Sequence, residues 1–254
     1  MIQTQQEYLA LITKVNQLRN EVQLFNEENI SEEALDNLKM QITNWERENP
    51  ENINPNSPNY TIAGGVATGF IKVAHQQRML SLNDIFIEVE LQQWEERWQK
   101  YADQNSIKIT DSFSEKKDKP FSINYICEPK IDGLAVSLIY KNGKLDQAVT
   151  RGDGFVGEDV TLNVNQIQSI PKYIQDQRKL EIRGEIFMTK SDFEELNQKI
   201  IDGILPGKMS KSGPEYVFAN PRNVASGTIR QLDSSVVKDR KLSFIAYNVS
   251  IHST

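Results

Sequence analysis

The chain has 254 residues, of which 38% are hydrophobic and 25% charged, a balance that excludes an intrinsically disordered protein. Its single cysteine excludes an internal disulfide and a cysteine-rich zinc site, and no apolar run is long enough to cross a bilayer. The net charge of −6 is uneven, since residues 1–120 hold 12 basic and 19 acidic residues and residues 121–254 hold 17 and 16. We therefore expect a cytoplasmic protein with no membrane partner, in which the second half would bind any polyanion.

The first part of the chain predicts a helical hairpin and a linker. Thr4 and Glu7 have capping-box spacing and open an amphipathic stretch. Ser31 is a favoured N-cap for a second helix. Residues 49–65 contain three prolines and two glycines with almost no apolar content, which is typical of a linker. We expect a helical subdomain with its linker over residues 1–64 and a second domain over residues 65–254.

The second part predicts a mixed sheet with helices around it. A helix is expected over residues 88–102, with Trp94 and Trp98 packed into a core. The apolar runs in residues 127–140 predict a buried strand, and residues 134–140, the Asn142-Gly143 turn and residues 144–151 together predict a hairpin. Further strands are expected at 180–187 and 242–248, and a helix capped by Ser191 should run to Ile201. The fold class is therefore α+β.

Three ionisable residues interrupt the strand predicted over 127–140. Glu128, Lys130 and Asp132 are spaced two apart, so in an extended chain they point to one face. A lysine amine is a nucleophile only when it is neutral, and partial burial and nearby cations favour that form. On spacing alone, a solvated edge strand of mixed charge explains these residues better than a catalytic lysine does.

Other charged residues change this balance. Arg151 follows the second strand of the hairpin, and Glu185 lies in the strand expected at 180–187. Arg222 and Arg230 surround a turn of small residues. Arginine suits phosphate because its planar guanidinium donates two parallel hydrogen bonds. Taken together, one lysine, several arginines and fixed carboxylates predict a pocket for phosphoryl chemistry.

Several long segments in a fixed order resemble the NAD-dependent bacterial DNA ligases. They are CEPKIDGLAVSLIY, TRGDGFVGEDVT, LEIRGEIF, FANPRNVASGTIRQLD and LSFIAYNV, preceded by NPNSPNYTIAGG and HQQRMLSLND. The similarity runs from about residue 15 to residue 250 and is far more specific than a lone Lys-x-Asp-Gly. The resemblance implies a helical NMN-binding subdomain followed by a nucleotidyltransferase (ATP-grasp-like) domain with a mixed or antiparallel sheet.

The resemblance also implies an adenylation site. Lys130 would attack the α-phosphorus of NAD, expel nicotinamide mononucleotide (NMN) and hold AMP as a phosphoramidate. Glu128 would bind the adenine, with Ser81 and Leu82 beside it. Asp132 would orient the amine or the phosphate, or hold a metal.

The same resemblance assigns roles to the strands and to the arginines. Arg151 and Glu185 would hold the ribose and its surroundings, and Tyr247 would lie against the adenine. Arg222 and Arg230 would meet the phosphates of nicked double-stranded DNA. Mg²⁺ would neutralise the charge that develops on phosphate. The expected role is adenylation for sealing nicks in DNA replication and repair.

The segment expected to bind NMN departs from the family pattern. Val22 and Gln23 stand where the family has a Tyr-His pair, Glu32 replaces an aspartate, and Leu35 replaces a tyrosine. Only Asp36 fits, so Glu32 and Asp36 are the candidates that remain on the NMN side. The lost aromatic and imidazole groups would remove stacking and hydrogen bonds worth roughly 1 kcal/mol or more each.

Relatives in the family continue past the Tyr247 strand into strands whose lysines contact the α-phosphate, and then into OB-fold, zinc-binding, helix-hairpin-helix and BRCT parts. This chain stops at Thr254. It is then a fragment, or is completed by a second polypeptide, or has lost catalysis. The alternatives to an NAD-dependent enzyme are a degenerate or split ligase-like protein that binds nucleotide or DNA without catalysis, and an enzyme that uses ATP as the donor.

Two further features have simpler explanations. Residues 208–212 spell KMSKS, a signature of class I aminoacyl-tRNA synthetases, but the chain lacks the accompanying His-Ile-Gly-His segment, so we interpret the match as coincidence. His75 is expected to be a hydrogen-bonded structural residue.

Overall fold

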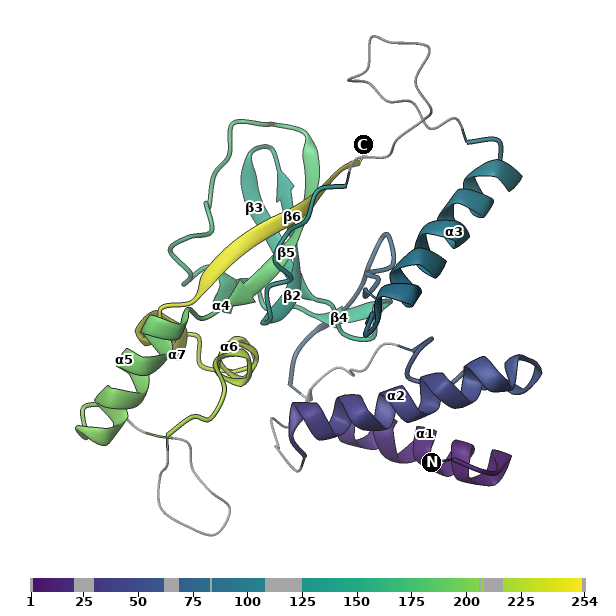
Figure 1. The fold of residues 1–254 in the computed structure, drawn as a ribbon. Coiled ribbons are helices and arrows are strands. Elements are labelled where there is room, and N and C mark those ends of the chain that lie inside the picture. The colour runs from purple at the N-terminus through teal and green to yellow at the C-terminus, as the bar shows by residue number, and fades with distance from the viewer. Residues whose placement is uncertain are drawn as a thin grey trace. The chain divides into compact units, whose positions relative to one another are not determined.

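The computed structural model describes residues 2–20, 30–61, 69–82, 84–107, 125–205, 207 and 217–252. Figure 1 shows the order of the elements along the chain. The chain divides into two compact units, one formed by Met1–Leu80 with Ile131–Thr254 and the other by Ser81–Lys130. The expected domain boundary at residue 64, the Val22-Gln23 pair and the KMSKS segment all lie outside the described residues.

The N-terminal part is the expected helical hairpin, made of α1 (Gln5–Asn20) and α2 (Glu32–Glu48). Thr4 and Glu7 form a reciprocal capping box, with the Glu7 N–H 3.2 Å from Thr4 Oγ1 and the Thr4 N–H 3.1 Å from a Glu7 carboxylate oxygen. The Ser31 hydroxyl accepts a hydrogen bond from the Ala34 N–H, as expected of an N-cap. The core of the hairpin contains Tyr8, Ile12, Val15, Ile42 and Trp45.

The first half of the expected linker is fastened to this hairpin. After α2 it forms one short 3-10 turn (Pro50–Asn52) and then irregular chain. The buried Glu46 accepts hydrogen bonds from the Tyr8 hydroxyl (2.7 Å) and the Asn59 amide (2.7 Å), and the Tyr8 oxygen accepts one from the Asn54 N–H (3.0 Å). Burial raises the pKa of Tyr8 to about 12. Arg19 also binds the Thr61 carbonyl at 2.9 Å, so the described segment up to residue 61 packs as part of the helical unit.

The second part contains a four-stranded antiparallel sheet in the order β3-β2-β5-β6. Its strands are β2 (Leu134–Lys141), β3 (Lys144–Thr150), β5 (Lys179–Phe187) and β6 (Ser243–His252). The β2–β3 turn has positive φ angles of 51° at Asn142 and 72° at Gly143, as the Asn-Gly pair predicts. A small second sheet pairs β1 (Lys72–Ala74) with β4 (Val156–Glu158).

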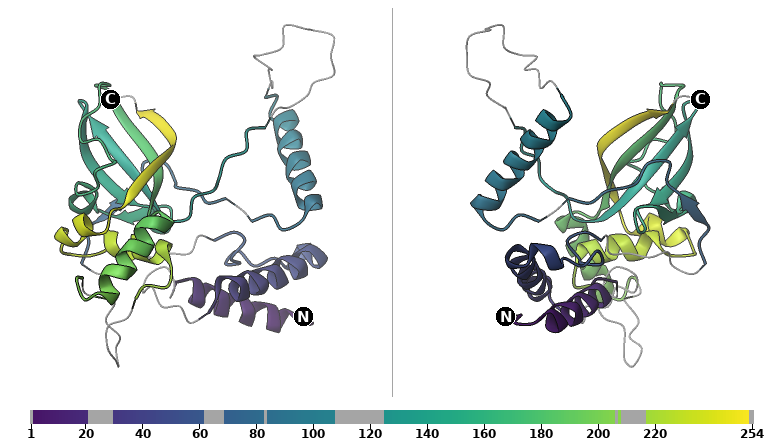
Figure 2. Two further views of the ribbon diagram at one scale, coloured as in Figure 1. Left: turned by 60° about the vertical axis from the view of Figure 1, so that its left-hand side comes forward. Right: turned by 90° about the vertical axis from the view of Figure 1, so that its right-hand side faces the viewer.

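One face of the four-stranded sheet carries the main core. Leu134, Val136, Leu138 and Tyr140 of β2 are buried there against residues of the helices. The helices are α4 (Thr161–Val164), α5 (Lys190–Ile201), α6 (Pro221–Ile229) and α7 (Ser235–Asp239), and Figure 2 shows α5, α6 and α7 together beside the sheet. These elements confirm the α+β class.

The predicted cap of α5 was wrong by two residues. Thr189, and not Ser191, precedes the helix with an extended backbone, and its hydroxyl accepts a hydrogen bond from the Asp192 N–H at 3.1 Å. Both residues have side chains that can cap, and the chain direction before the helix decides between them.

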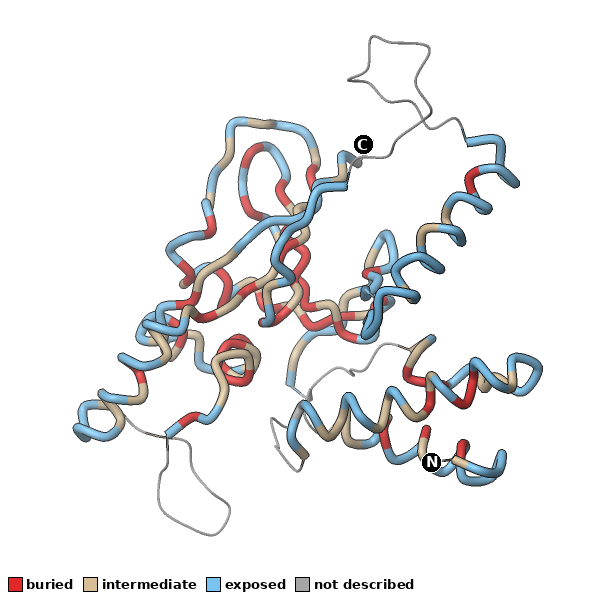
Figure 3. The backbone as a smooth tube through the Cα atoms, in the orientation of Figure 1, coloured by how far each residue is buried: buried red, intermediate tan, exposed pale blue. Residues whose placement is uncertain are grey.

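Two other expectations were wrong. Residues 125–133 form no strand, so the strand predicted over 127–140 begins at Leu134 and Cys127 is exposed. The helix expected at 88–102 is present as α3 (Glu88–Gln104), and Figure 3 shows most of it as exposed. Its Trp94 is 40% exposed, Trp98 is only partly buried, and Ala102 is its buried residue. Among the described helices, none has the length and apolar character needed to span a membrane.

Candidate active site

The register of three strands places two of the expected site residues in one row across the sheet. Ala135 of β2 pairs with Glu185 of β5, and the Arg151 N–H, just after β3, donates to the Ala135 carbonyl at 3.0 Å. Since Leu134 and Val136 point into the main core, these side chains belong to the opposite face.

Glu185 is the carboxylate of this row, on β5. Its oxygen accepts a hydrogen bond from the Gly133 N–H at 3.2 Å. Burial raises the pKa of Glu185 to about 7, against the opposing effects of Arg151 and Arg222, and Asp132 raises it further. Glu185 therefore lies among two cations and a second carboxylate, in a position partly withdrawn from water.

Burial also shifts the pKa values of two neighbours of Glu185. Burial lowers the pKa of Arg151, and the charge of Glu185 opposes that shift. Burial, followed by the charge of Glu185, raises the pKa of Tyr247 on β6. Arg151, Glu185 and Tyr247, assigned to one nucleotide from the resemblance, are therefore electrostatic neighbours on the sheet. Their role in binding a nucleotide remains a prediction.

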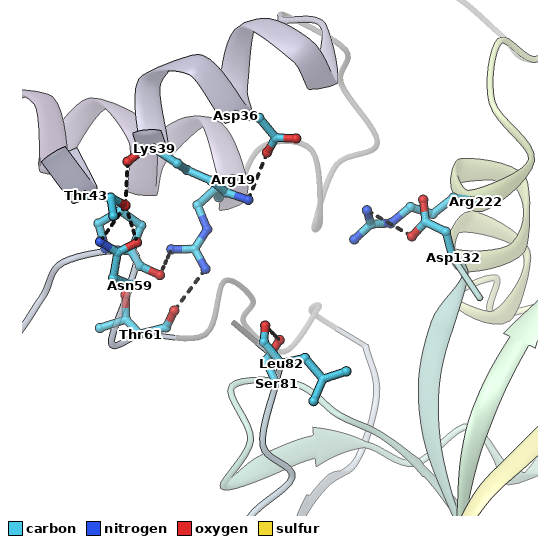
Figure 4. A network of polar contacts seen from close by, with 11 residues as sticks. Arg19, Asp36, Lys39, Thr43, Asn59, Thr61, Ser81, Leu82, Asp132 and Arg222 are labelled. Atoms are coloured by element: carbon cyan, nitrogen blue, oxygen red, sulfur yellow. Dashed lines mark hydrogen bonds and ion pairs between the residues drawn. The ribbon is translucent and has the colours of Figure 1, made fainter. Parts of the chain in front are cut away.

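An ion pair between Arg222 and Asp132 links α6 to the segment just before β2. Arg222 Nη1 lies 3.1 Å from Asp132 Oδ1, and both side chains are substantially exposed (Figure 4). Arg222 is placed by the first turn of α6, where the Asn220 side chain accepts a hydrogen bond from the Arg222 N–H. An exposed pair of this kind can open to admit an anionic ligand at a cost of at most about 1 kcal/mol.

Arg230 occupies a different environment from Arg222. Its side chain is 8% exposed, and its Nε lies 3.3 Å from a carboxylate oxygen of the fully buried Glu158. Glu158 also accepts a hydrogen bond from the Thr150 hydroxyl. The guanidinium thus neutralises a buried carboxylate, and the contact of Arg230 with DNA phosphates remains a prediction.

The close packing around Glu158 requires a glycine. A Cβ on Gly157 would lie 1.8 Å from the Thr150 carbonyl oxygen, so no other residue lets β4 approach β3 this closely. The turn thereby brings Glu158 next to Thr150 and sets the backbone of Arg151 at the end of β3.

Four expected site residues lie in or at the end of the Ser81–Lys130 unit. Ser81, Leu82, Glu128 and Lys130 are all exposed and belong to irregular chain, not to a strand. The idea that Glu128, Lys130 and Asp132 share the face of one strand is therefore wrong. Lys130 is nonetheless covalently two residues from Asp132, and its role as nucleophile remains a prediction.

The helical hairpin carries the residues expected on the NMN side. Asp36 is exposed and pairs with Lys39, whose Nζ lies 3.1 Å from its carboxylate (Figure 4). Leu35 is partly buried against the core of the hairpin. Glu32 is the first residue of α2, and its side chain lies outside the described part of the chain.

Sequence reasoning missed a second polar group on the sheet face, formed by Ser137, Glu181 and Arg183. Ser137 donates to Glu181 at 2.8 Å, and Arg183 Nε donates to the same carboxylate at 2.8 Å. The period-two spacing of Glu181, Arg183 and Glu185 could have indicated a polar face of β5, but the contact with Ser137 depends on the strand register.

The described residues contain no group of three or more His, Cys, Asp and Glu side chains that could hold a metal ion. Mg²⁺ commonly uses one or two carboxylates together with substrate phosphates and water. Asp132, half exposed and two residues after Lys130, fits that kind of ligation.

The raised pKa of Glu185 predicts a dependence of stability on pH. Between pH 4.5, the usual pKa, and about 7, the folded state keeps a proton that the unfolded state has lost. The free energy of unfolding should therefore fall as pH rises through this window, by at most about 3 kcal/mol from this group, and level off above it. Urea unfolding of wild type and Glu185→Gln from pH 5 to 8 measures the difference, and parallel curves would contradict the prediction.

Comparison with known proteins identifies one family and two relatives. A family model described as NAD-dependent DNA ligase adenylation domain matches residues 67–254. A protein named DNA ligase from Helicobacter pylori (strain P12) is 38% identical over 253 residues, covering 100% of this chain and 34% of that protein. Another DNA ligase, from Aliarcobacter butzleri (strain RM4018), is 39% identical over 250 residues, covering 98% of this chain and 34% of its own length. The chain thus spans about a third of the length of these curated relatives.

Proposed function

Because the chain belongs to the NAD-dependent DNA ligase adenylation domain family, we propose that it transfers AMP from NAD to Lys130 as the first step of sealing a DNA nick. The observation that supports this most directly is that Asp132, two residues after Lys130, is an electrostatic neighbour of Glu185, which has Arg151 and Tyr247 as further neighbours. Cations, carboxylates and an aromatic ring are the groups that recognise phosphate, ribose and base.

The proposed step replaces one bond to phosphorus by another. The lone pair of the Lys130 amine attacks the α-phosphorus of NAD, a P–N bond forms, and the bond from phosphorus to the NMN oxygen breaks. The amine gives up a proton to solvent or a nearby base, and NMN leaves with its phosphate. The product is AMP held on Lys130 as a phosphoramidate, a reserve of activated adenylate for a DNA 5′-phosphate.

The residues of the sheet would hold the nucleotide during this step. An ionised Glu185 would accept hydrogen bonds from ribose hydroxyls, and Tyr247 would lie against the adenine ring. Arg151 would balance the charge of Glu185, and Asp132, when Arg222 releases it, would orient the amine or bind Mg²⁺. When bound, Mg²⁺ would supply positive charge to the phosphate oxygens in phosphoryl transfer.

Nicked double-stranded DNA is the proposed acceptor, and Arg222 is the better candidate for a phosphate contact. Its side chain is 39% exposed, against 8% for Arg230. A second polypeptide or a further part of the same protein could supply the remaining DNA-binding surface.

A second candidate function follows from the helical hairpin. Leu35 stands where the family has a tyrosine, so no aromatic ring is offered to a nicotinamide at this position. Its side chain is instead partly buried against the hairpin core. If recognition of NMN is lost, the donor becomes ATP, or the protein binds nucleotide or DNA without forming the adduct.

The test compares two donors that carry the same label. The protein is incubated with Mg²⁺ and either NAD or ATP labelled in the adenylate, and acid-labile, protein-bound label is measured. We expect label from NAD and essentially none from ATP. Label from ATP alone would support the altered donor, and AMP binding with no adduct from either donor would support the non-catalytic alternative.

A further inference from the structure

The chain that precedes residue 81 is hydrogen-bonded to β4, to the turn before β4 and to the end of β3. β1 pairs with β4, and the N–H groups of His75 and Met79 donate to the carbonyls of Phe155 (2.8 Å) and Gly154 (2.9 Å). The imidazole of His75 also lies 3.0 Å from the Thr150 carbonyl oxygen, so His75 is hydrogen-bonded, as expected. The Met79 side chain is 2% exposed.

Arg183 of β5 fastens the end of this segment. Its Nη2 donates to the Gln77 carbonyl at 2.7 Å and its Nη1 to the Arg78 carbonyl at 3.2 Å, while its Nε donates to Glu181 at 2.8 Å. The arginine side chain is 14% exposed and the Glu181 side chain 5%. A planar guanidinium can make these three bonds at once, whereas the single ammonium of a lysine cannot reproduce their fixed geometry.

The position of Arg183 on β5 relates it to the other end of the Ser81–Lys130 unit. Arg183 and Glu185 are two apart in one strand and so share a face. Arg183 holds the backbone three and four residues before Ser81, and Glu185 accepts from the N–H of Gly133, three residues after Lys130. One strand thus binds the backbone shortly before Ser81 and shortly after Lys130.

We propose that Arg183 is a positioning residue for adenine-nucleotide binding, which acts by fixing the backbone that leads into Ser81 and Leu82. The inference rests on the proposed function, since these two residues are expected beside the adenine. This role requires no contact between Arg183 and the substrate. It restricts the directions in which the chain can leave Leu80, and so lowers the entropy that nucleotide binding must remove.

The test uses two variants, because Arg183→Ala would leave the buried Glu181 carboxylate without this counter-charge and could unfold the protein. Arg183→Lys keeps the charge. Arg183→Met with Glu181→Gln removes both charges and keeps an acceptor for Ser137. The matched control is Arg178→Met with Asp176→Asn, since this pair has the same two-residue spacing, is more exposed than Arg183 and Glu181, and lies immediately before β5.

We expect both Arg183 variants to bind AMP about tenfold more weakly by equilibrium dialysis, with an unchanged urea midpoint in the double variant. Hydrogen exchange at the His75 and Met79 amides should accelerate, and the control should match wild type in each measurement. Wild-type AMP affinity in both Arg183 variants would overturn the inference while the proposed function stands. A wild-type protein that binds neither AMP nor NAD would overturn the proposed function and the inference with it.

Discussion

Replacing Lys130 by arginine should reduce acid-labile adenylate labelling to below about one-thousandth of the wild-type value, while leaving the unfolding curve unchanged. The reason is chemical, because a guanidinium keeps the positive charge but has no lone pair available to attack phosphorus at any pH that the protein tolerates. Lys130 is exposed and lies in irregular chain, so the substitution disturbs no described packing. Labelled NAD, gel separation and mass spectrometry of the adenylated peptide provide the measurement.

Lys144→Arg is the matched control, since Lys144 is also exposed and stands beside a turn, at the start of β3. It should be labelled as wild type is. Label retained in Lys130→Arg would assign the nucleophile to another residue and would remove the central element of the proposed function. Loss of label in both variants would indicate damage to the domain instead of loss of the nucleophile.

Features set by a few consecutive residues were predicted well from the sequence. The capping box of Thr4 and Glu7, the N-cap Ser31 and the Asn142-Gly143 turn all depend on residues no more than four apart. Local chemistry decides such features almost independently of the rest of the fold. The α5 cap was misplaced because Thr189 and Ser191 offer the same chemistry, and only the backbone distinguishes them.

The hairpin pattern predicted the strand over residues 134–140 correctly, whereas its extension back to residue 127 was wrong because that extension has no partner strand. The spacing of Glu128, Lys130 and Asp132 has the period of a strand, but the β2–β5 ladder begins at Leu134, which pairs with Ile186. A Cβ on Gly133 would lie 2.1 Å from the Ile186 carbonyl oxygen, so this glycine allows the close approach at the point where the ladder ends. A two-residue spacing of side chains does not show whether the segment has a partner strand.

The candidate site shows the same division. Resemblance to a family was enough to select Arg151, Glu185 and Tyr247, and the structure brings these three side chains together. The contacts of Arg183 with Gln77 and Arg78 join residues more than 100 positions apart in the chain, so no local pattern contains them. Arg222 and Arg230 belong to one sequence motif, but Arg222 is partly exposed and Arg230 is buried, a difference that the motif does not reveal.

The buried pair of Glu158 and Arg230 predicts the largest effect on stability. Arg230→Met should lower the free energy of unfolding by about 3–5 kcal/mol, because it leaves a carboxylate that is 0% exposed without this counter-charge. Since domains have only about 5–15 kcal/mol of stability, the variant should be partly unfolded at 37 °C. Glu158→Gln combined with Arg230→Met removes both charges, keeps an acceptor for Thr150 and should recover most of the loss. Urea unfolding of the two variants and wild type measures both effects.

The same variants test whether Arg230 affects DNA binding directly or through the stability of the fold. If it acts through the fold, the double variant should bind a nicked duplex as wild type does, with the same dependence of affinity on salt. A direct phosphate contact would instead leave the double variant weakened and reduce the slope of log K against log salt by about 1. Arg222→Gln provides the contrast, because its pair with Asp132 is exposed and its loss should lower the salt slope with little change in stability. A double variant as unstable as Arg230→Met would show that the cost lies in packing and not in the unpaired charge.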